Sequence, residues 1–488
     1  MMNRCLVSFS TLLALLFCLV SCSKDPLRTF DVSVVEDFIF SERPVAEFRG
    51  SLEGDILGAR FGVVYSADKD KLKLPNSLER ELLDLKAYHF RADGSFAILS
   101  EDLEVDTKYY YCWFAFMGGT SLYGEVKEFS TCHPYSFQAD LDLDAAVDLS
   151  SSGTANCYIL SEPGLYKFRT VRGNGDESVG EVAASAILWE TYGTSEVPVI
   201  CDMIRSACYK DGYIVFETSE EFKEGNASVA AKDADGNILW SWHIWLTDEP
   251  QVQVYYNDAG VMMDRNLGAT STERGTSQVY GLLYQWGRKD PFLGASYVST
   301  SCSKPAASTL YWPSAIDADV TTGRIEYATS HPTTYIVPGF SDSGYYYYGR
   351  IEGARWNESD LPKSVYDPCP QGWRVPDGGK ESVWAKAAGV SYVSREGVRE
   401  HGMDFSGVFG AGHDIWYPYA GCSFYNSLHS VDSQGHYWTA SVHENGDAMQ
   451  FWLGVRSDHG YSEVYADFSN RTGDVTDACS VRCVRDGN

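Results

Sequence analysis

The stretch from Ser441 to Asp477 carries the side chains in this sequence that are best suited to bind another molecule. It concentrates tyrosine, arginine, histidine, asparagine and aspartate, and it contains no lysine. Tyrosine rings supply contact area at little entropic cost, while the polar side chains supply adaptable hydrogen bonds. We therefore predict a ligand-binding face here, or else an ordinary solvated region of strands and loops. The candidate binding residues are His443, Asn445, Arg456, Asp458, His459, Tyr461 and Tyr465.

Residues that could carry out catalysis or hold a metal form no complete set in the sequence. Histidines and acids lie close together in His401-Gly-Met-Asp404 and in His413-Asp414, a spacing suited to acid–base chemistry. No nucleophile completes either pair, and the chain has no G-x-S-x-G, H-E-x-x-H or phosphate-loop motif. We therefore expect no enzymatic activity, no metal and no cofactor.

The first residues indicate an export signal. Arg4 provides a short positive region, and Leu12 to Val20 is an apolar segment too short to span a bilayer. The segment ends in Leu19-Val20-Ser21-Cys22, which resembles the lipobox of bacterial lipoproteins. That resemblance implies a signal peptide at 1–21 and lipid on the sulfur of Cys22, which would anchor the chain stably in membrane lipid. The alternative is a plain secretory signal with an incidental cysteine.

The net charge and the cysteine content indicate which classes of partner and which cellular compartment to expect. The formal net charge is -28, and phosphate binding needs a basic face, so we expect no nucleic-acid partner. Of the 13 cysteines, Cys5 and Cys18 leave with the signal and Cys22 takes the lipid. The other cysteines are even in number, which is consistent with disulfide bonds in an oxidising compartment. None forms a C-x-x-C pair, so we expect no zinc cluster.

The secondary structure that carries the candidate binding residues is predicted to be mostly β-strand. Aromatic residues make up 14% of the chain, which favours strands. After a polar tether at 22–29, strand-like runs such as Tyr109 to Phe116 predict a β-sandwich over 30–132. A second β-sandwich is predicted over 133–250, where Asp140 to Asp144 alternates as a half-buried strand should.

Two neighbouring segments of the second sandwich carry finer predictions. Asp233 to Asn237 has an Asp-Gly step and lacks the closing glutamate of a calcium loop, so we predict a hairpin turn. The run that follows should be a strand with Trp240, Trp242 and Ile244 on one face. His243 falls on the other face, and we expect it to be packed rather than functional.

The first sandwich resembles a fibronectin type III domain. Leu103, Thr107, Tyr109 and Tyr111 match the signature L-x-x-x-T-x-Y-x-Y, although the proline that usually precedes the threonine is absent. In that family the tyrosine hydroxyl supports a corner of the sandwich.

The last part of the chain, 251–488, carries five motifs in a recognisable order. They are Met263-Asp-Arg-Asn-Leu267, Leu283-Tyr-Gln-Trp-Gly-Arg288, Cys369-Pro-Gln-Gly-Trp-Arg-Val-Pro376, Tyr437-Trp-Thr-Ala-Ser441 and Ser480-Val-Arg-Cys-Val-Arg-Asp486. Together they resemble the Fibrobacter succinogenes major paralogous domain, or FISUMP domain, which is common in surface lipoproteins of gut Bacteroidetes. The resemblance implies a C-type-lectin-like α+β fold, although the calcium motifs of that fold are missing.

The same motifs predict how this domain is held together. Cys369 and Cys483 frame two of them and are expected to form a disulfide, which at that loop length contributes about 3–5 kcal/mol. Trp286, Trp373 and Trp438 are expected to pack in the core rather than form a sugar platform. One short helix is predicted near Ser382 to Ala388.

Together these features predict a lipid-anchored protein of the outer membrane or cell surface. We expect an adhesin or ligand-binding protein whose C-terminal domain takes a glycan or a host or partner protein. The alternative is a structural envelope or pilus-associated protein that has surface-assembly partners and no ligand of its own. The placement of 441–477 also resembles the variable regions of retroelement-diversified lectin-fold proteins, so diversification of this face stays open.

Overall fold

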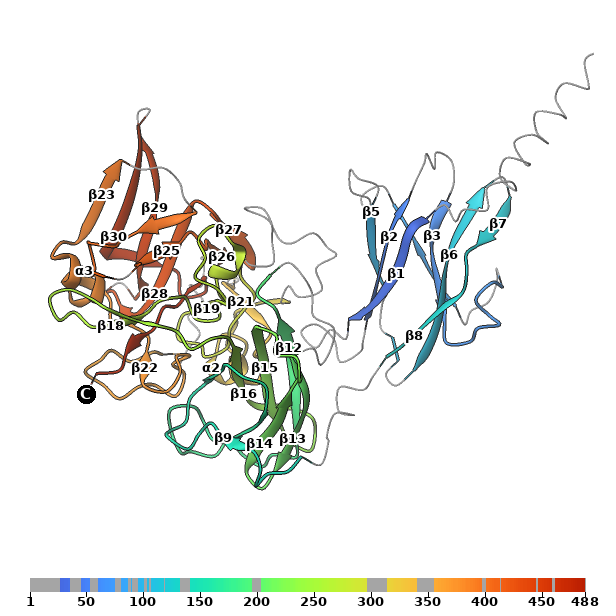
Figure 1. Ribbon diagram of the computed structural model, residues 1–488, viewed down its shortest axis with the longest axis horizontal. Coiled ribbons are helices and arrows are strands. Elements are labelled where there is room, and N and C mark those ends of the chain that lie inside the picture. The colour runs from blue at the N-terminus through green and yellow to red at the C-terminus, as the bar shows by residue number, and fades with distance from the viewer. Residues whose placement is uncertain are drawn as a thin grey trace, which may run out of the picture. The chain divides into compact units, whose positions relative to one another are not determined.

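A computed structural model of the chain describes residues 27–35, 45–52, 60–74, 80–86, 89, 95–100, 103–104, 107–117, 119–131, 141–194, 203–295, 314–339, 355–396, 401–412, 414–444, 446–458 and 461–487. These residues form mostly β-strands, as predicted (Figure 1). The chain divides into two compact units, 1–36 with 43–132 and 37–42 with 133–488. The predicted signal peptide and Cys22 lie outside the described residues.

The first unit contains two sheets around an aromatic core. One sheet has the order β1 (Leu27–Val35), β2 (Val45–Leu52), β5 (Ser95–Leu99). The other has the order β4 (Glu81–Asp84), β3 (Arg60–Ser66), β6 (Lys108–Met117), β7 (Thr120–Tyr123), with β8 (Lys127–Ser130) also pairing with β6. Phe48 of the first sheet packs against Tyr65 and Tyr111 of the second. The Glu104 N–H donates to the Tyr109 hydroxyl at 2.9 Å, the corner contact that the signature predicts.

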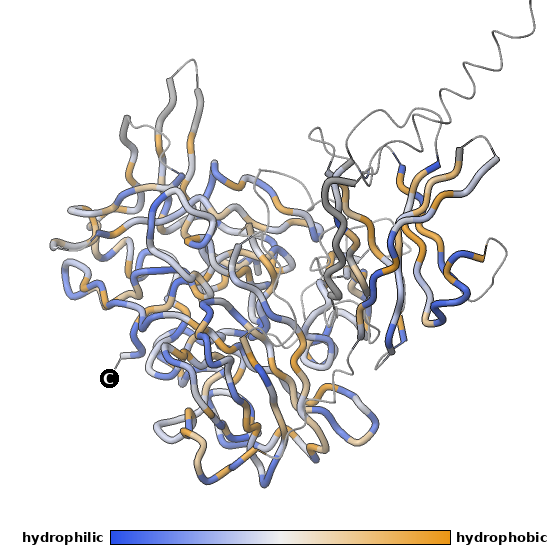
Figure 2. Tube along the Cα trace, turned by 45° about the vertical axis from the view of Figure 1, so that its right-hand side comes forward, coloured by the Kyte–Doolittle hydropathy of each residue, from blue (hydrophilic) through white to orange (hydrophobic). Residues whose placement is uncertain are grey.

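The second unit begins with two four-stranded sheets. One has the order β10 (Cys157–Leu160), β16 (Ile238–Leu246), β15 (Gly225–Lys232), β12 (Ala184–Thr191). The other has the order β13 (Ile204–Lys210), β14 (Tyr213–Thr218), β11 (Leu165–Arg169), β9 (Val147–Asp148). Phe168, Phe216 and Trp242 meet between them in a buried core. Hydrophobic and hydrophilic segments alternate along the described chain (Figure 2).

The prediction of a strand at Asp140–Asp144 is wrong for its described residues. The side chain of Asp142 accepts hydrogen bonds from the backbone N–H groups of Asp144 and Ala145, which closes a turn instead. The hairpin turn at Asp233–Asn237 is confirmed, since Asp233 N–H donates to the Asn237 carbonyl between β15 and β16.

Strand β16 is buried on both of its faces. Trp240, Trp242 and Ile244 enter the sandwich core, as the alternation predicts. The opposite face packs against the last part of the chain. Ser241 accepts a hydrogen bond there from the buried Lys289 ammonium at 2.6 Å, and the indole N–H of Trp245 donates to the Ala269 carbonyl at 3.1 Å. Residues 133–250 and 251–488, predicted as separate domains, therefore pack into one compact unit.

The last part of the chain is built on one large twisted sheet with several small ones. The large sheet has the order β23 (Tyr392–Glu396), β30 (Tyr461–Gly473), β29 (Ala448–Asp458), β28 (Gln434–Val442), β31 (Ala478–Ser480), β26 (Cys422–Phe424), β27 (Ser427–His429), with β19 (Leu283–Gln285) on β31. A four-stranded sheet has the order β17 (Val252–Val254), β18 (Val261–Met263), β32 (Val484–Arg485), β22 (Trp373–Arg374). The two-stranded sheets pair β20 (Ala315–Asp317) with β21 (Tyr335–Val337) and β24 (Gly402–Asp404) with β25 (Trp416–Pro418). The helices are α2 (Ile325–Ser330), α3 (Val383–Ala388) and the 3₁₀ turns Ser277–Val279 and Gly379–Glu381.

Helix α3 is the short helix that the sequence predicts. The Ser382 hydroxyl accepts a hydrogen bond from the backbone N–H of Ala385, which caps its first turn. Gly389 ends the helix in the left-handed conformation, with φ 67°. Trp384 on this helix is fully buried, and its indole N–H donates to the Tyr417 hydroxyl at 2.7 Å in the core beneath the large sheet.

The predicted disulfide between Cys369 and Cys483 is present, with a Cα–Cα distance of 6.0 Å. Both cysteines are buried. Trp286 and Trp438 are core residues, as predicted, and their indole N–H groups donate to the carbonyls of Thr439 and Tyr284 at 2.8 Å. Trp373 is only half-buried, because it lies on the small sheet near the C-terminus, where Arg485 covers its ring.

Candidate ligand-binding site

Strands β28, β29 and β30 separate an inner from an outer set of side chains, because successive residues of a strand point to opposite faces. Phe451, Leu453 and Ala466 belong to the core beneath the sheet. Trp452 and Tyr465 alternate with them and therefore lie on the outer face. Trp452 lies within the predicted stretch 441–477 but is not one of the candidate binding residues predicted there.

Four rings form a continuous strip on this outer face. Tyr392 stacks on Tyr465 with ring centroids 5.6 Å apart, and Tyr465 contacts Trp452 at 6.0 Å. His436 continues the strip from Trp452 at 6.5 Å. We call Tyr392, Tyr465, Trp452 and His436 the aromatic strip. Its outer end is accessible, since Tyr392 is 58% exposed, while the Arg471 guanidinium covers Trp452 at 4.7 Å. An exposed ring at the end of such a strip suits stacking against a flat, polar ligand.

Polar side chains line the buried end of the strip. The Trp452 indole N–H donates to the carboxamide oxygen of Gln434 at 3.2 Å, and the Gln450 carboxamide nitrogen donates to the Thr472 carbonyl at 3.0 Å. His436 lies between both glutamines, with its ring nitrogens 3.0 and 3.1 Å from their oxygens. The strip thus offers rings at one end and hydrogen-bonding groups along its side.

The structure brings together only part of the predicted ligand face. Tyr465 is in the aromatic strip. His443 is exposed in the turn between β28 and β29, where its backbone N–H donates to the Asp447 carbonyl. Arg456, Asp458 and Tyr461 belong to strands β29 and β30, but their side chains lie outside the described part of the chain, as do Asn445 and His459 entirely. Tyr392 was missed because it joins the face from β23, far away in sequence.

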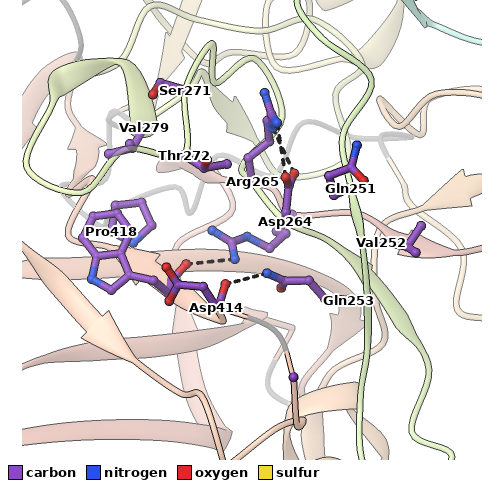
Figure 3. A pocket seen from close by; sticks show the side chains of 13 residues that line it. Gln251, Val252, Gln253, Asp264, Arg265, Ser271, Thr272, Val279, Asp414 and Pro418 are labelled. Carbon is purple, nitrogen blue, oxygen red and sulfur yellow. Dashed lines mark hydrogen bonds and ion pairs between the residues drawn. The ribbon is translucent and has the colours of Figure 1, made fainter.

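A second candidate is a polar pocket of about 280 Å³ (Figure 3). It is lined by Gln251, Val252, Gln253, Asp264, Arg265, Ser271, Thr272, Val279, Gly412, Asp414, Trp416, Pro418 and Arg482. The Gln253 carboxamide donates to the Asp414 carbonyl at 2.8 Å. The carboxamide oxygen of Gln253 and the indole nitrogen of Trp416 are buried without a hydrogen-bond partner among the described residues. Buried polar groups without partners are costly, so a ligand that satisfies them gains affinity.

Two arginines shape the electrostatics of this pocket. Arg265 pairs with Asp264 at 2.9 Å and with Asp248 at 2.5 Å. Burial lowers the pKa of Arg265, but its hydrogen bonds to the two carboxylates outweigh that effect and raise it. In turn, hydrogen bonding to Arg265 lowers the pKa of Asp248. Arg482 is held over the ring of Tyr417 at 3.8 Å. This pocket was not predicted from the sequence, although Asp264 and Arg265 belong to the first of the five motifs and Arg482 to the fifth.

The acid–histidine pairs noted in the sequence do not form in the described residues. Asp404 and Asp414 both bind the Arg274 guanidinium, and His401 instead contacts Asp432 at 2.6 Å. His413 lies outside the part of the chain that is described. Within that part, no group of three or more histidine, cysteine, aspartate or glutamate side chains is placed to hold a metal ion. No helix among the described residues is long and apolar enough to cross a bilayer.

Comparison with known proteins leaves the family of this chain undetermined. No protein-family model matches it, and no curated protein matches it. A solved structure titled "Biofilm associated protein - BSP domain" is 12% identical, and the match covers 52% of this chain and 58% of that chain with a TM-score of 0.14. A likeness at this level carries no argument about fold or function.

Proposed function

We propose that this chain is an exported lipoprotein of the outer membrane or cell surface, anchored through Cys22, that captures a ligand with its C-terminal part. On this proposal residues 30–132 are a fibronectin type III-like domain and 251–488 a FISUMP, lectin-like domain. The proposal is carried by the aromatic strip, in which the exposed Tyr392 ring stacks on the half-buried Tyr465 and Tyr465 contacts Trp452 beneath the Arg471 guanidinium. The ligand class is a glycan or a host or partner protein.

Aromatic rings next to planar polar groups favour such ligands for a physical reason. A ring covers the apolar face of a sugar, or a side chain of a protein, without a large loss of conformational entropy. Arginine and glutamine beside it then satisfy the polar edge of the ligand. The net charge of -28 would repel strongly acidic ligands at long range, which favours neutral or basic ones.

The test is binding of the mature chain from Cys22 onward to glycan and host-protein arrays. Replacing both Tyr392 and Tyr465 by alanine should lower the affinity for any ligand found by about tenfold or more, as loss of central aromatic contacts does. Tyr256→Ala is the matched control, because Tyr256 is an exposed tyrosine outside the strip. Unchanged binding by the double variant would move the site away from the strip.

The polar pocket is a second candidate site, favoured by the buried Gln253 oxygen and Trp416 nitrogen. Gln253→Leu keeps the size of the side chain and removes its polar atoms, so it should weaken a pocket ligand and spare a strip ligand. A chain that binds nothing on either array would instead support the structural envelope or pilus-associated role.

A further inference from the structure

Two free cysteines of the large sheet face each other across neighbouring strands. Ser423 of β26 pairs with Ala478 of β31 in antiparallel register, so the next pair is Cys422 and Cys479. Residues opposite each other in such a pair have Cα atoms about 4.5–5.5 Å apart, within the span of about 4.4–6.8 Å that a disulfide bridges. The strand register therefore places the two cysteines within the span of a disulfide.

His436 lies beside this pair with hydrogen-bond acceptors at both of its ring nitrogens. The carboxamide nitrogen of Gln450 is used by a backbone carbonyl, so its oxygen faces the imidazole Nδ1 at 3.0 Å. The Gln434 oxygen, which already accepts from the indole of Trp452, lies 3.1 Å from Nε2. Both ring nitrogens thus face acceptors, and only an imidazolium donates from both.

The charges around Cys422 favour its thiolate. The hydrogen bond with Cys479 lowers the pKa of Cys422 most; burial opposes this effect, and His436 and His429 add to the lowering. Burial lowers the pKa of His436, but the charge of Cys422 and the hydrogen bonds with Cys422 and Gln450 together outweigh burial and raise it. The titratable groups that face the pair are Cys479, Asp477, His429, His436, Arg471 and Tyr335. Burial raises the pKa of Asp477 to about 9, so this carboxyl is neutral at pH 7 and does not oppose the thiolate.

The other free cysteines of the described chain lack this environment. Burial raises the pKa of Cys112 to about 11 and raises that of Cys157 further still. A thiolate is the nucleophile in thiol chemistry, so these two cysteines are unreactive while Cys422 is poised to react.

We propose that Cys422 and Cys479 are a redox-active dithiol, which reacts with a disulfide oxidant through the Cys422 sulfur and closes into a cross-strand disulfide. The Cys422 thiolate attacks one sulfur of the oxidant and releases the first thiolate, which is protonated from the solvent. The Cys479 thiol then gives up its proton and attacks the Cys422 sulfur of the mixed disulfide, and the second thiolate leaves and takes that proton. Two protein thiols and one disulfide become one protein disulfide and two small thiols.

Oxidation would also change the binding surface described above. It removes the Cys422 charge that raises the pKa of His436, so that pKa falls, and His436 is one end of the aromatic strip. It also ties β26 to β31 through Cys479, four residues before the resident disulfide at Cys483. The redox state of the two cysteines therefore affects the charge of the aromatic strip.

The first experiment detects the bond. Reduced mature chain is treated with oxidised glutathione, quenched with acid and digested with trypsin without reduction. Cleavage after Arg471 and Arg482 separates Cys479 from Cys483, so a bond to Cys422 joins the peptides 400–456 and 472–482. That linked peptide is the expected product. Two free thiols, or a stable glutathione adduct on Cys422, would overturn the proposal.

The second experiment tests the thiolate by alkylation with iodoacetamide at pH 6. Cys422 should react about 100-fold or more faster than Cys208, since the thiolate is the reactive form and the two are similarly buried, at 9% and 6% exposure. His436→Gln should slow the reaction of Cys422 by about tenfold or more and raise the pH at which it becomes fast. His429→Gln, the matched control, should have a smaller effect. Equal rates for Cys422 and Cys208, or no effect of His436→Gln, would refute the role of His436 and the thiolate.

Discussion

His243 should make the second unit lose stability as the pH falls from 7 to 5. The residue is 2% exposed on β16, and its Nε2 lies 2.8 Å from the Asn226 carboxamide oxygen. The Asn226 nitrogen donates to the Gly268 carbonyl, so its oxygen faces the imidazole, which must donate from Nε2. The other nitrogen, Nδ1, is buried without a partner among the described residues. Protonation would place an unpaired charge in the core, and burial lowers the pKa of His243 to about 3.

The magnitude follows from the two protonation equilibria. In the unfolded chain a histidine has a pKa of about 6.5. Below that pH His243 binds a proton in the unfolded state but not in the folded state. The free energy of unfolding therefore falls as the pH drops from 6.5 toward 3. The contribution is fully present above pH 6.5. Between pH 7 and pH 5 this one residue should remove about 2 kcal/mol.

The assay is urea denaturation followed by tryptophan fluorescence at both pH values. Trp113 is the one tryptophan before residue 133 among 13 in the chain, so the signal reports mainly on the second unit. His243→Gln removes the titration, and the stability difference between wild type and variant should change by about 2 kcal/mol between pH 7 and pH 5. His331→Gln, at an exposed histidine, is the control and should leave the wild-type pH dependence intact. Parallel pH dependences of wild type and His243→Gln would refute the reasoning.

Three further changes test other parts of the molecule. Cys22→Ala should release the protein from the membrane fraction or leave it unprocessed, and a variant that keeps its lipid mass would contradict the lipobox. Cys369 and Cys483 should appear as one linked peptide in non-reducing mass spectrometry of protein from its native compartment, and Cys369→Ser should lower the urea midpoint, with a loss of about 3–5 kcal/mol. Lys289→Met should cost about 3–5 kcal/mol in the same urea assay, because it leaves the Asp290 carboxylate buried without its partner at 2.6 Å. A loss under about 1 kcal/mol would contradict the stabilising role of this buried ion pair.

The class of the fold and several local features could be predicted from the sequence because they depend on neighbouring residues. The alternation in β16 assigned Trp240 and His243 to opposite faces, and the Asp-Gly step placed the hairpin before it. Ser382 and the glycine after Ala388 bound the short helix α3 for equally local reasons. The prediction of a strand at Asp140–Asp144 was wrong because the side chain of Asp142 accepts a backbone hydrogen bond that closes a turn. Such a local hydrogen bond competes with strand pairing, and the alternation of residue types does not reveal it.

Which strand faces pack against each other depends on the three-dimensional fold. Alternation says that β16 has two faces, but not that the second one packs against Lys289 and Ala269. The same holds for Tyr392, which joins Tyr465 across β23 and β30, and for Cys422, which meets Cys479 across β26 and β31. Such contacts follow from the order and register of strands that are distant in the chain. Local periodicity carries no information about that pairing, since it repeats identically whichever strand becomes the neighbour.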